Sequence, residues 1–198
     1  MNAPFNGKFR LTQQQHANHD GFDLVPLEDK NIYSTVAGVV VWAGWENKDN
    51  VKQGFGQYVC IKNDADGAFY YFGHMSEVSV KYGDKVKVCD KIGVVGHTGY
   101  CIPDNENGTH LHYCARKQFS TGNALDISAI SGIPNALGVY DDGYRPNANT
   151  TKPQQAQTSP TAALDNDIKV SIKPKTTKEI EAIIEAYGHT YSGLLTED

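Results

Sequence analysis

Short runs of alternating apolar and polar residues dominate the first two-thirds of the chain. Such alternation, interrupted by clusters of Gly, Asp and Asn, is typical of β-strands that bury one face. The pattern predicts longer strands over residues 32–45, 55–62, 68–75 and 109–117, and shorter ones between residues 78 and 96. A turn cluster, NDADG at 63–67, predicts that the second and third of these strands form a hairpin. Short strands at regular spacing predict an all-β, antiparallel domain.

Both ends of the chain depart from this pattern. Residues 1–32 are interpreted as polar and irregular. Residues 141–167 are rich in Pro, Asn, Thr, Gln and Asp, which predicts a flexible linker after a domain over residues 1–140. In residues 168–198, Thr176 and Glu179 form a possible capping box before apolar residues at helical spacing. We therefore expect a short helical C-terminal segment, whose role the sequence does not indicate.

The composition excludes several classes of protein. The chain has 198 residues and a formal net charge of −5, which argues against nucleic acid as a partner. It contains no apolar run long enough to insert into a membrane. The N-terminus shows no apolar signal region, so we expect a trimmed fragment or a protein that reaches its target by another route, such as phage-mediated lysis.

Four cysteines occur, and none forms a CxxC pair. This spacing disfavours a cysteine zinc knuckle. We expect buried or partly buried free thiols at Cys60, Cys89, Cys101 and Cys114, although the spacing does not exclude one disulfide bridge.

Histidines gather in three segments that could form one metal site. His110 and His112 are two apart on a predicted strand, so their side chains share a face. His19 and Asp23 can converge on them if the chain turns at Gly21. Two imidazoles and one carboxylate suit a catalytic zinc, with the fourth position open to water.

Other interpretations of these histidines remain open. Two histidines on a strand can be an ordinary surface feature. His16 and Asp20 are also four apart, but Gly21 lies between His19 and Asp23, and Asp23 leads into an apolar run. We therefore prefer the second pair and expect His16 to be a solvated histidine or a substrate contact. His97 is expected to be a plain loop residue.

Taken together, these segments resemble the LytM/lysostaphin-type zinc endopeptidases of family M23. The resemblance rests on His19-x-Gly-x-Asp23, on Phe72-Gly73-His74 and on His110-x-His112. It extends over about residues 5–118 through five further segments: FRLTQ at 9–13, VAGVV at 36–40, V-x-x-GD-x-V at 80–86, IG-x-x-G at 92–96 and TG at 98–99. No HExxH sequence is present, so the helical zincin arrangement is absent.

The resemblance implies a fold, a metal and roles for five residues. It implies an antiparallel sheet and split-barrel core of the duplicated hybrid type. It implies one Zn²⁺ per chain bound by His19, Asp23 and His112, with His74 and His110 as catalytic histidines. The implied activity is a zinc metallo-endopeptidase that hydrolyses stem-peptide or cross-bridge bonds of bacterial peptidoglycan. With no signal peptide seen, we expect a phage lysin or a tail-associated wall enzyme.

Three positions depart from the usual family pattern. Phe72 replaces a tyrosine, Gln57 stands where asparagine is common, and the loop over residues 100–108, YCIPDNENG, is longer and more polar. None of them removes an implied ligand. The altered loop bears on substrate specificity.

Two other classes compete with an enzyme. Relatives that have lost ligands act as scaffolds or regulators of wall enzymes, but here all five implied positions are filled. The segment over residues 80–95 also resembles the hairpin of lipoyl and biotinyl carrier domains. The lysine signature of those carriers is absent, so we attribute this likeness to a shared hairpin.

Overall fold

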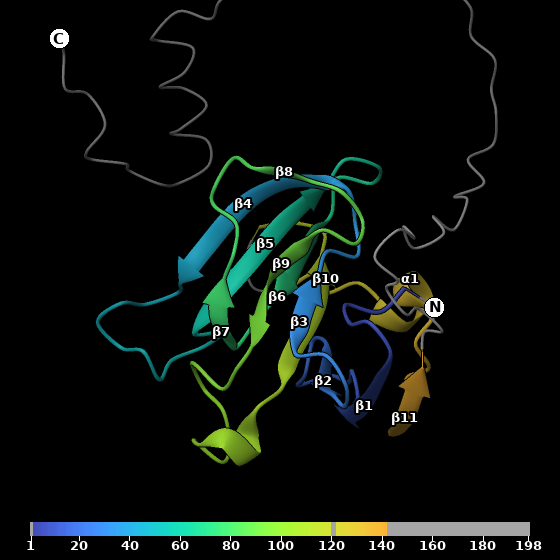
Figure 1. The fold of residues 1–198 in the computed structure, drawn as a ribbon. Helices are drawn as coiled ribbons and strands as arrows, with labels where there is room; N and C mark the ends of the chain where they lie inside the picture. Colours follow the sequence, from blue (N-terminus) through green and yellow to red (C-terminus); the bar gives the residue numbers. More distant parts are fainter. Residues whose placement is uncertain (1, 120–121, 142–198) are drawn as a thin grey trace, which may run out of the picture. The chain divides into compact units, whose positions relative to one another are not determined.

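The computed structural model describes residues 2–119 and 122–141, which fold into two antiparallel sheets (Figure 1). The larger sheet has eight strands in the order β11-β1-β2-β10-β6-β5-β4-β8. The smaller has three, in the order β3-β9-β7. The strands are β1 (Lys8–Gln13), β2 (Phe22–Pro26), β3 (Asn31–Tyr33), β4 (Gly38–Trp45), β5 (Gln57–Asn63), β6 (Phe69–Phe72), β7 (Met75–Val78), β8 (Lys85–Val86), β9 (Lys91–Val95), β10 (Leu111–Arg116) and β11 (Gly138–Asp141). The predicted antiparallel all-β class is confirmed.

Alternate residues of the central strands build the core. Leu111 and Tyr113 of β10 are fully buried, as are Phe22 and Leu24 on the neighbouring β2. Burial of each such side chain contributes roughly 1.5–3 kcal/mol. The Tyr113 hydroxyl is satisfied at 2.8 Å by the hydroxyl of Thr35, so its burial leaves no polar atom unpaired. The core-facing side chains of β10 therefore hold the strand in place by packing. The side chains on its other face are not needed for this packing.

The hairpin predicted around residues 63–67 is present. β5 and β6 pair antiparallel, with Cys60 opposite Tyr71. Gly67 adopts a φ of 72° in the turn and donates its N–H to the carbonyl of Asn63 at 3.0 Å. The long segment over residues 32–45 divides into β3 and β4, and β4 begins at Gly38. A side chain at Gly38 would collide with the backbone of Lys62 on β5, so glycine permits this close pairing.

The prediction that residues 1–32 are irregular is wrong. This segment contains β1 and β2, which pair with each other and join the large sheet through β10. Each strand is short and buries only two side chains toward the core: Phe9 and Leu11 on β1, and Phe22 and Leu24 on β2. Two inward residues make a weak alternation, which the surrounding glutamines and histidines obscure.

Two elements near the end of the described chain were also missed. A short helix, α1 (Ile127–Ser131), begins with Asp126 as N-cap and ends at Gly132 in the left-handed conformation. β11 pairs with β1, so Asp141, where the predicted linker begins, still belongs to the sheet. The rest of that linker and the predicted helical segment lie outside the described residues. Within the described part of the chain, no helix has the length and apolar character needed to cross a membrane.

Candidate metal and catalytic site

The register of β10 against β2 places the predicted metal ligands together. His112 lies directly opposite Asp23 in this antiparallel pair. Because side chains alternate along a strand, the residues of β10 that flank the core-facing Leu111 and Tyr113 point to the other face. That face carries His110, just before the strand, followed by His112, Cys114 and Arg116. One strand therefore supplies much of the site.

Gly21 allows the His19–Asp23 segment to approach β10. A Cβ atom at Gly21 would lie 2.5 Å from the carbonyl oxygen of Tyr113 and 2.9 Å from Nε2 of His112. Only glycine fits this approach without displacing β10. On the N-terminal side, His16 and His19 exchange backbone hydrogen bonds of 2.9 and 3.0 Å, which close a tight turn. His19 is thus held beside Asp23 from both sides.

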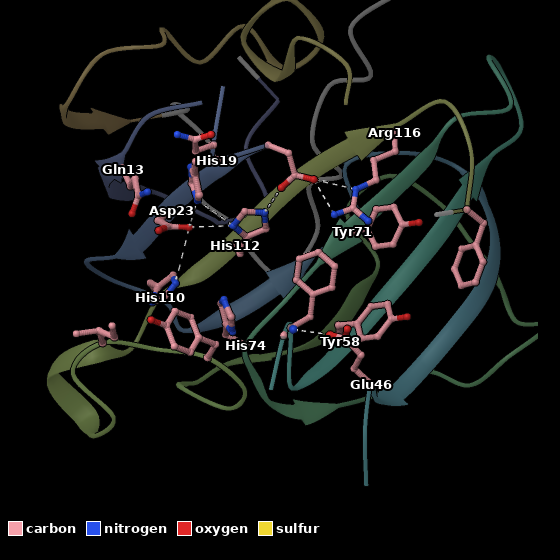
Figure 2. Close-up of a pocket in the computed structure, with 17 residues that line it drawn as sticks. Gln13, His19, Asp23, Glu46, Tyr58, Tyr71, His74, His110, His112 and Arg116 are labelled. Carbon is pink, nitrogen blue, oxygen red and sulfur yellow. Dashed lines mark hydrogen bonds and ion pairs between the residues drawn. The ribbon is translucent and has the colours of Figure 1, made fainter. Parts of the chain in front are cut away.

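Three donor atoms converge at the centre of the site (Figure 2). Nε2 of His19 lies 3.1 Å from Oδ1 of Asp23 and 3.2 Å from Nδ1 of His112. Nδ1 of His112 lies 3.0 Å from the same Asp23 oxygen. Ligands around a tetrahedral zinc with bonds of ~2.0–2.1 Å are roughly 3.3–3.4 Å apart. The three atoms already stand within a few tenths of an ångström of that arrangement.

The hydrogen bonds of the two histidines leave lone pairs directed toward the centre of the site, which suits a cation. Nδ1–H of His19 donates to the carbonyl of Gln14 at 2.9 Å, so Nε2 of the neutral ring carries a lone pair. When Nε2–H of neutral His112 donates to Asp20, its Nδ1 carries a lone pair too. Two imidazole lone pairs and a carboxylate oxygen then face one another. A zinc ion placed among them would satisfy all three.

The charges around His112 favour a positive charge at this position. Burial alone would raise the pKa of Asp23, but hydrogen bonds with His112 and His19 hold it well below its ordinary value. Burial alone would lower the pKa of His112, but hydrogen bonds with Asp20 and Asp23 raise it well above its ordinary value. Two ionised carboxylates thus flank one ring, and the donor set fits a divalent cation.

Asp20 holds the far side of the His112 ring. Oδ1 of Asp20 accepts a hydrogen bond from Nε2 of His112 at 3.1 Å. Its Oδ2 accepts from Arg116, at 2.8 Å from Nε and 2.6 Å from an Nη atom. The Arg116 guanidinium in turn lies over the rings of Tyr71 and Phe55, at 4.6 and 5.2 Å from their centroids. This chain of contacts fixes the orientation and the tautomer of His112.

His74 and His110 lie side by side next to the three converging donors. Their ring centroids are 4.6 Å apart, and Nε2 of His110 lies 3.7 Å from Oδ1 of Asp23. Each ring donates its Nδ1–H to a backbone carbonyl, His74 to Thr98 at 2.8 Å and His110 to Gly108 at 2.7 Å. The neutral form of each therefore carries its lone pair on Nε2. Both rings can accept a proton there.

The backbone and surroundings of His74 are unusual. Its φ of 61° lies in the left-handed region, which is uncommon for a residue other than glycine. Its N–H donates to the carbonyl of Phe55 at 2.8 Å. Burial, together with the nearby His110, lowers the pKa of His74 to about 3, so the ring is neutral at neutral pH. Such strain and desolvation are common at functional sites.

These groups line an open groove of about 690 Å³. The three converging donors and the two histidines lie on one side of it, and the largely buried rings of Tyr58 and Tyr71 line it on the side of Arg116 (Figure 2). Tyr100 and Ile102 extend into solvent from the long loop at 100–108, with 68% and 76% of their surface exposed. The full lining consists of Gln13, Asn18, His19, Asp20, Asp23, Glu46, Gly54, Phe55, Tyr58, Tyr71, His74, Tyr100, Ile102, His110, His112, Arg116 and Phe119.

The structure brings together all five residues predicted for the site. His16, the alternative ligand, is exposed and belongs to no candidate metal group among the described residues. Its expected partner, Asp20, instead contacts His112. His97 is a half-buried loop residue that does not line the groove. Phe72 points into the core against Tyr113, so its departure from the family pattern leaves the groove unchanged.

Sequence reasoning considered Asp20 only as the alternative metal partner of His16, and it missed Arg116. The signal for Arg116 was available, because it lies four residues after His112 and therefore on the same strand face. Asp20 carried no such signal, since its contact depends on the turn at Gly21. The predicted free thiols are confirmed: Cys60, Cys101 and Cys114 are buried, Cys89 is half-buried, and none forms a disulfide. Burial raises the pKa of the Cys101 thiol to about 12.

A family model decides the relationship of the chain to known proteins. Residues 17–127, which include every residue of the five-membered site, match the model of peptidase family M23. The chain belongs to peptidase family M23. The family also accounts for the mostly antiparallel fold.

Individual members of the family show the same likeness. The chain is 30% identical over 154 residues to the glycyl-glycine endopeptidase ALE-1 of Staphylococcus capitis, covering 75% of this chain and 40% of that protein. It is 32% identical over 114 residues to an uncharacterized metalloprotease of Buchnera aphidicola subsp. Baizongia pistaciae, covering 57% of this chain and 27% of that protein. The chain thus spans less than half of each relative.

A solved structure gives the same result for the fold. The catalytic domain of the prophage-encoded M23 protein EnpA from Enterococcus faecalis, determined as a variant, superposes with a TM-score of 0.50 at 27% sequence identity. The match covers 63% of this chain and 94% of that domain. The matched part of the chain therefore corresponds to nearly all of that domain.

Proposed function

We propose that this M23 peptidase is a zinc metallo-endopeptidase that hydrolyses peptide bonds in bacterial peptidoglycan. The observation that carries the proposal is the convergence of His19 Nε2, Asp23 Oδ1 and His112 Nδ1 within 3.0–3.2 Å of one another. The name of ALE-1, a glycyl-glycine endopeptidase, supports the hydrolysis of peptide bonds. His19, Asp23 and His112 would hold one zinc ion.

Zinc, when bound, supplies Lewis acidity that lowers the pKa of a water molecule and polarises the scissile carbonyl. Asp20 keeps His112 oriented, because its carboxylate accepts a hydrogen bond from Nε2–H of the ring. Arg116 keeps the Asp20 carboxylate in place and ionised. Two charged side chains, Asp20 and Arg116, thus orient the ligand His112.

His74 and His110 provide the proton transfers. A neutral ring with its lone pair on Nε2 accepts the proton of the attacking water. The partner ring, protonated at Nε2, donates a hydrogen bond to the oxygen on which negative charge develops. Both rings face the groove beside the three ligands, and the backbone carbonyls of Thr98 and Gly108 fix their orientation. The pair supplies a base and a donor without a glutamate.

The open groove suits an extended peptide. Its lining includes the two histidines, Arg116 and the rings of Phe55, Tyr58 and Tyr71. Tyr58 and Tyr71 are largely buried, so their rings form a fixed wall against which a substrate chain can pack. The long loop at 100–108 adds the exposed side chains of Tyr100 and Ile102 to the lining. We infer that this loop contributes to the choice of bond.

The function is tested by digestion of purified peptidoglycans with different cross-bridges, followed by mass spectrometry of the soluble products. We expect peptides with new amino and carboxyl termini from at least one type of wall, and glycan strands left uncut. A correctly folded, zinc-loaded chain that releases no peptide from any wall would favour the alternative of a catalytically silent scaffold.

A further inference from the structure

A second group of metal-ligating side chains lies beside the proposed zinc site. Donor atoms of His74, Cys101 and His110 all lie within 4.8 Å of one another. The three residues are separate from His19, Asp23 and His112, so both groups can be complete at the same time. Cys101 belongs to the loop at 100–108, the segment in which the chain departs from its family.

Hydrogen bonding prepares the two histidines to bind an ion. Nδ1–H of His74 and Nδ1–H of His110 are both engaged by backbone carbonyls, so each neutral ring directs a lone pair from Nε2. The 4.6 Å between their ring centroids brings these nitrogens to one side of the groove. Neutral imidazole is a ligand for zinc and related ions.

Cys101 is positioned against the same pair through one backbone carbonyl. Its Sγ lies 3.5 Å from the carbonyl oxygen of Thr98, which also accepts the Nδ1–H of His74 at 2.8 Å. Cys101 is 5% exposed, and its sequence neighbours Tyr100 and Ile102 line the groove. Nitrogen and sulfur donors around a tetrahedral zinc are roughly 3.3–3.6 Å apart, so the donor atoms, which lie within 4.8 Å of one another, must approach by at most about 1.5 Å to complete the set.

We propose that His74, Cys101 and His110 form a second, inhibitory site for a thiophilic divalent cation such as zinc or cadmium. When the ion binds, the Cys101 thiol releases its proton to solvent and a sulfur–metal bond forms. The two Nε2 lone pairs become metal ligands as well. That this blocks hydrolysis rests on the proposed function, since the same lone pairs are the ones that transfer protons. Excess metal would then switch the enzyme off.

The experiment titrates the full chain, already holding one zinc, with Cd²⁺. The first site has no sulfur ligand, so a thiolate-to-cadmium absorption band reports Cys101. We expect one further equivalent with this band and a loss of peptidoglycan hydrolysis in step with it. Cys101→Ser should lose the band, the second equivalent and the inhibition, while zinc content and basal activity stay unchanged. Cys89→Ser, at a half-buried thiol outside every candidate metal group of the described residues, should behave as the unmodified chain.

Two results would overturn the second site. One is a band that persists in Cys101→Ser, which would assign the sulfur to another thiol, such as Cys114 beside Asp20 and His112. The other is equal inhibition of Cys101→Ser and the unmodified chain. If the zinc-loaded chain hydrolyses no wall at all, the proposed function fails, and the absorption titration still decides whether the second site exists.

Discussion

The carboxylate of Asp20 and the ring of His112 are joined on the side that faces away from the converging donors. Oδ1 of Asp20 accepts from Nε2 of His112 at 3.1 Å, while Nδ1 of the same ring faces Asp23 at 3.0 Å. The carboxylates of Asp20 and Asp23 thus contact the two ring nitrogens of the same imidazole. This relationship fixes which nitrogen of His112 is available to a metal.

Asp20→Asn is expected to weaken zinc binding about 10–100-fold, the usual effect of losing an outer hydrogen-bond partner of a ligand. The amide is nearly isosteric but lacks the charge that holds the His112 proton and the Arg116 guanidinium. Competition with a chelator measures the affinity. Asp64→Asn, at an exposed turn position, is the control and should bind zinc normally. Equal affinities in both variants would remove Asp20 from the site.

His19→Ala, Asp23→Ala and His112→Ala should each abolish stoichiometric zinc, because three protein ligands leave no spare donor. Metal analysis of the purified variants measures this. His16→Ala should retain about one zinc per chain, since the exposed His16 ring belongs to no candidate group among the described residues. Loss of zinc from His16→Ala alone would return the assignment to the pair His16 and Asp20.

His74→Ala and His110→Ala should keep zinc and fold but lose about 10²–10⁴ in hydrolysis rate, the usual cost of removing a base or an oxyanion donor. The comparison is the rate of peptide release per zinc-loaded chain. His97→Ala, in the neighbouring loop but outside the groove, is the matched control and should retain the full rate. Wild-type rates in both groove variants would leave the mechanism without a base.

Gly21→Ala should impair both stability and metal binding. The new methyl group would meet the Tyr113 carbonyl at 2.5 Å and His112 Nε2 at 2.9 Å, so the turn or β10 must move. Forced overpacking of this kind costs about 1–3 kcal/mol. Urea unfolding and zinc content measure the two effects. Gly138→Ala, where the nearest atom lies at 3.5 Å, should change neither.

Stability should fall as the pH drops from about 6.5 toward 3, and His74 should contribute to this fall. The unfolded chain takes up a proton at His74 near its ordinary pKa of 6.5, whereas the folded chain does so only at about 3. Between these pH values the unfolded state binds more protons than the native state. Acidification therefore lowers the free energy of unfolding. Urea unfolding at several pH values, with zinc removed, should show a shallower acid dependence for His74→Gln. Identical slopes would mean that His74 is not buried as a neutral ring.

The sequence predicted the central strands because they leave short, local signals, whereas the full set of five site residues came from the resemblance to family M23. β5 and β6 are short, largely buried runs on either side of the turn at 63–67, and His110 and His112 share a face by spacing alone. β1 and β2 left no such signal, since each turns only two apolar side chains inward. Asp20 and the second group around Cys101 depend on how separate loops pack against β10. Contacts of that kind are fixed by tertiary structure and leave no periodic trace.

The most direct test of the account is a zinc titration of the metal-free chain during digestion of peptidoglycan. Peptide release, followed by mass spectrometry, should rise to its maximum at one equivalent of zinc, with the metal bound by His19, Asp23 and His112. Release that is unchanged by removal of the metal, or its absence at one bound equivalent, would contradict the proposal that this chain is a zinc peptidase.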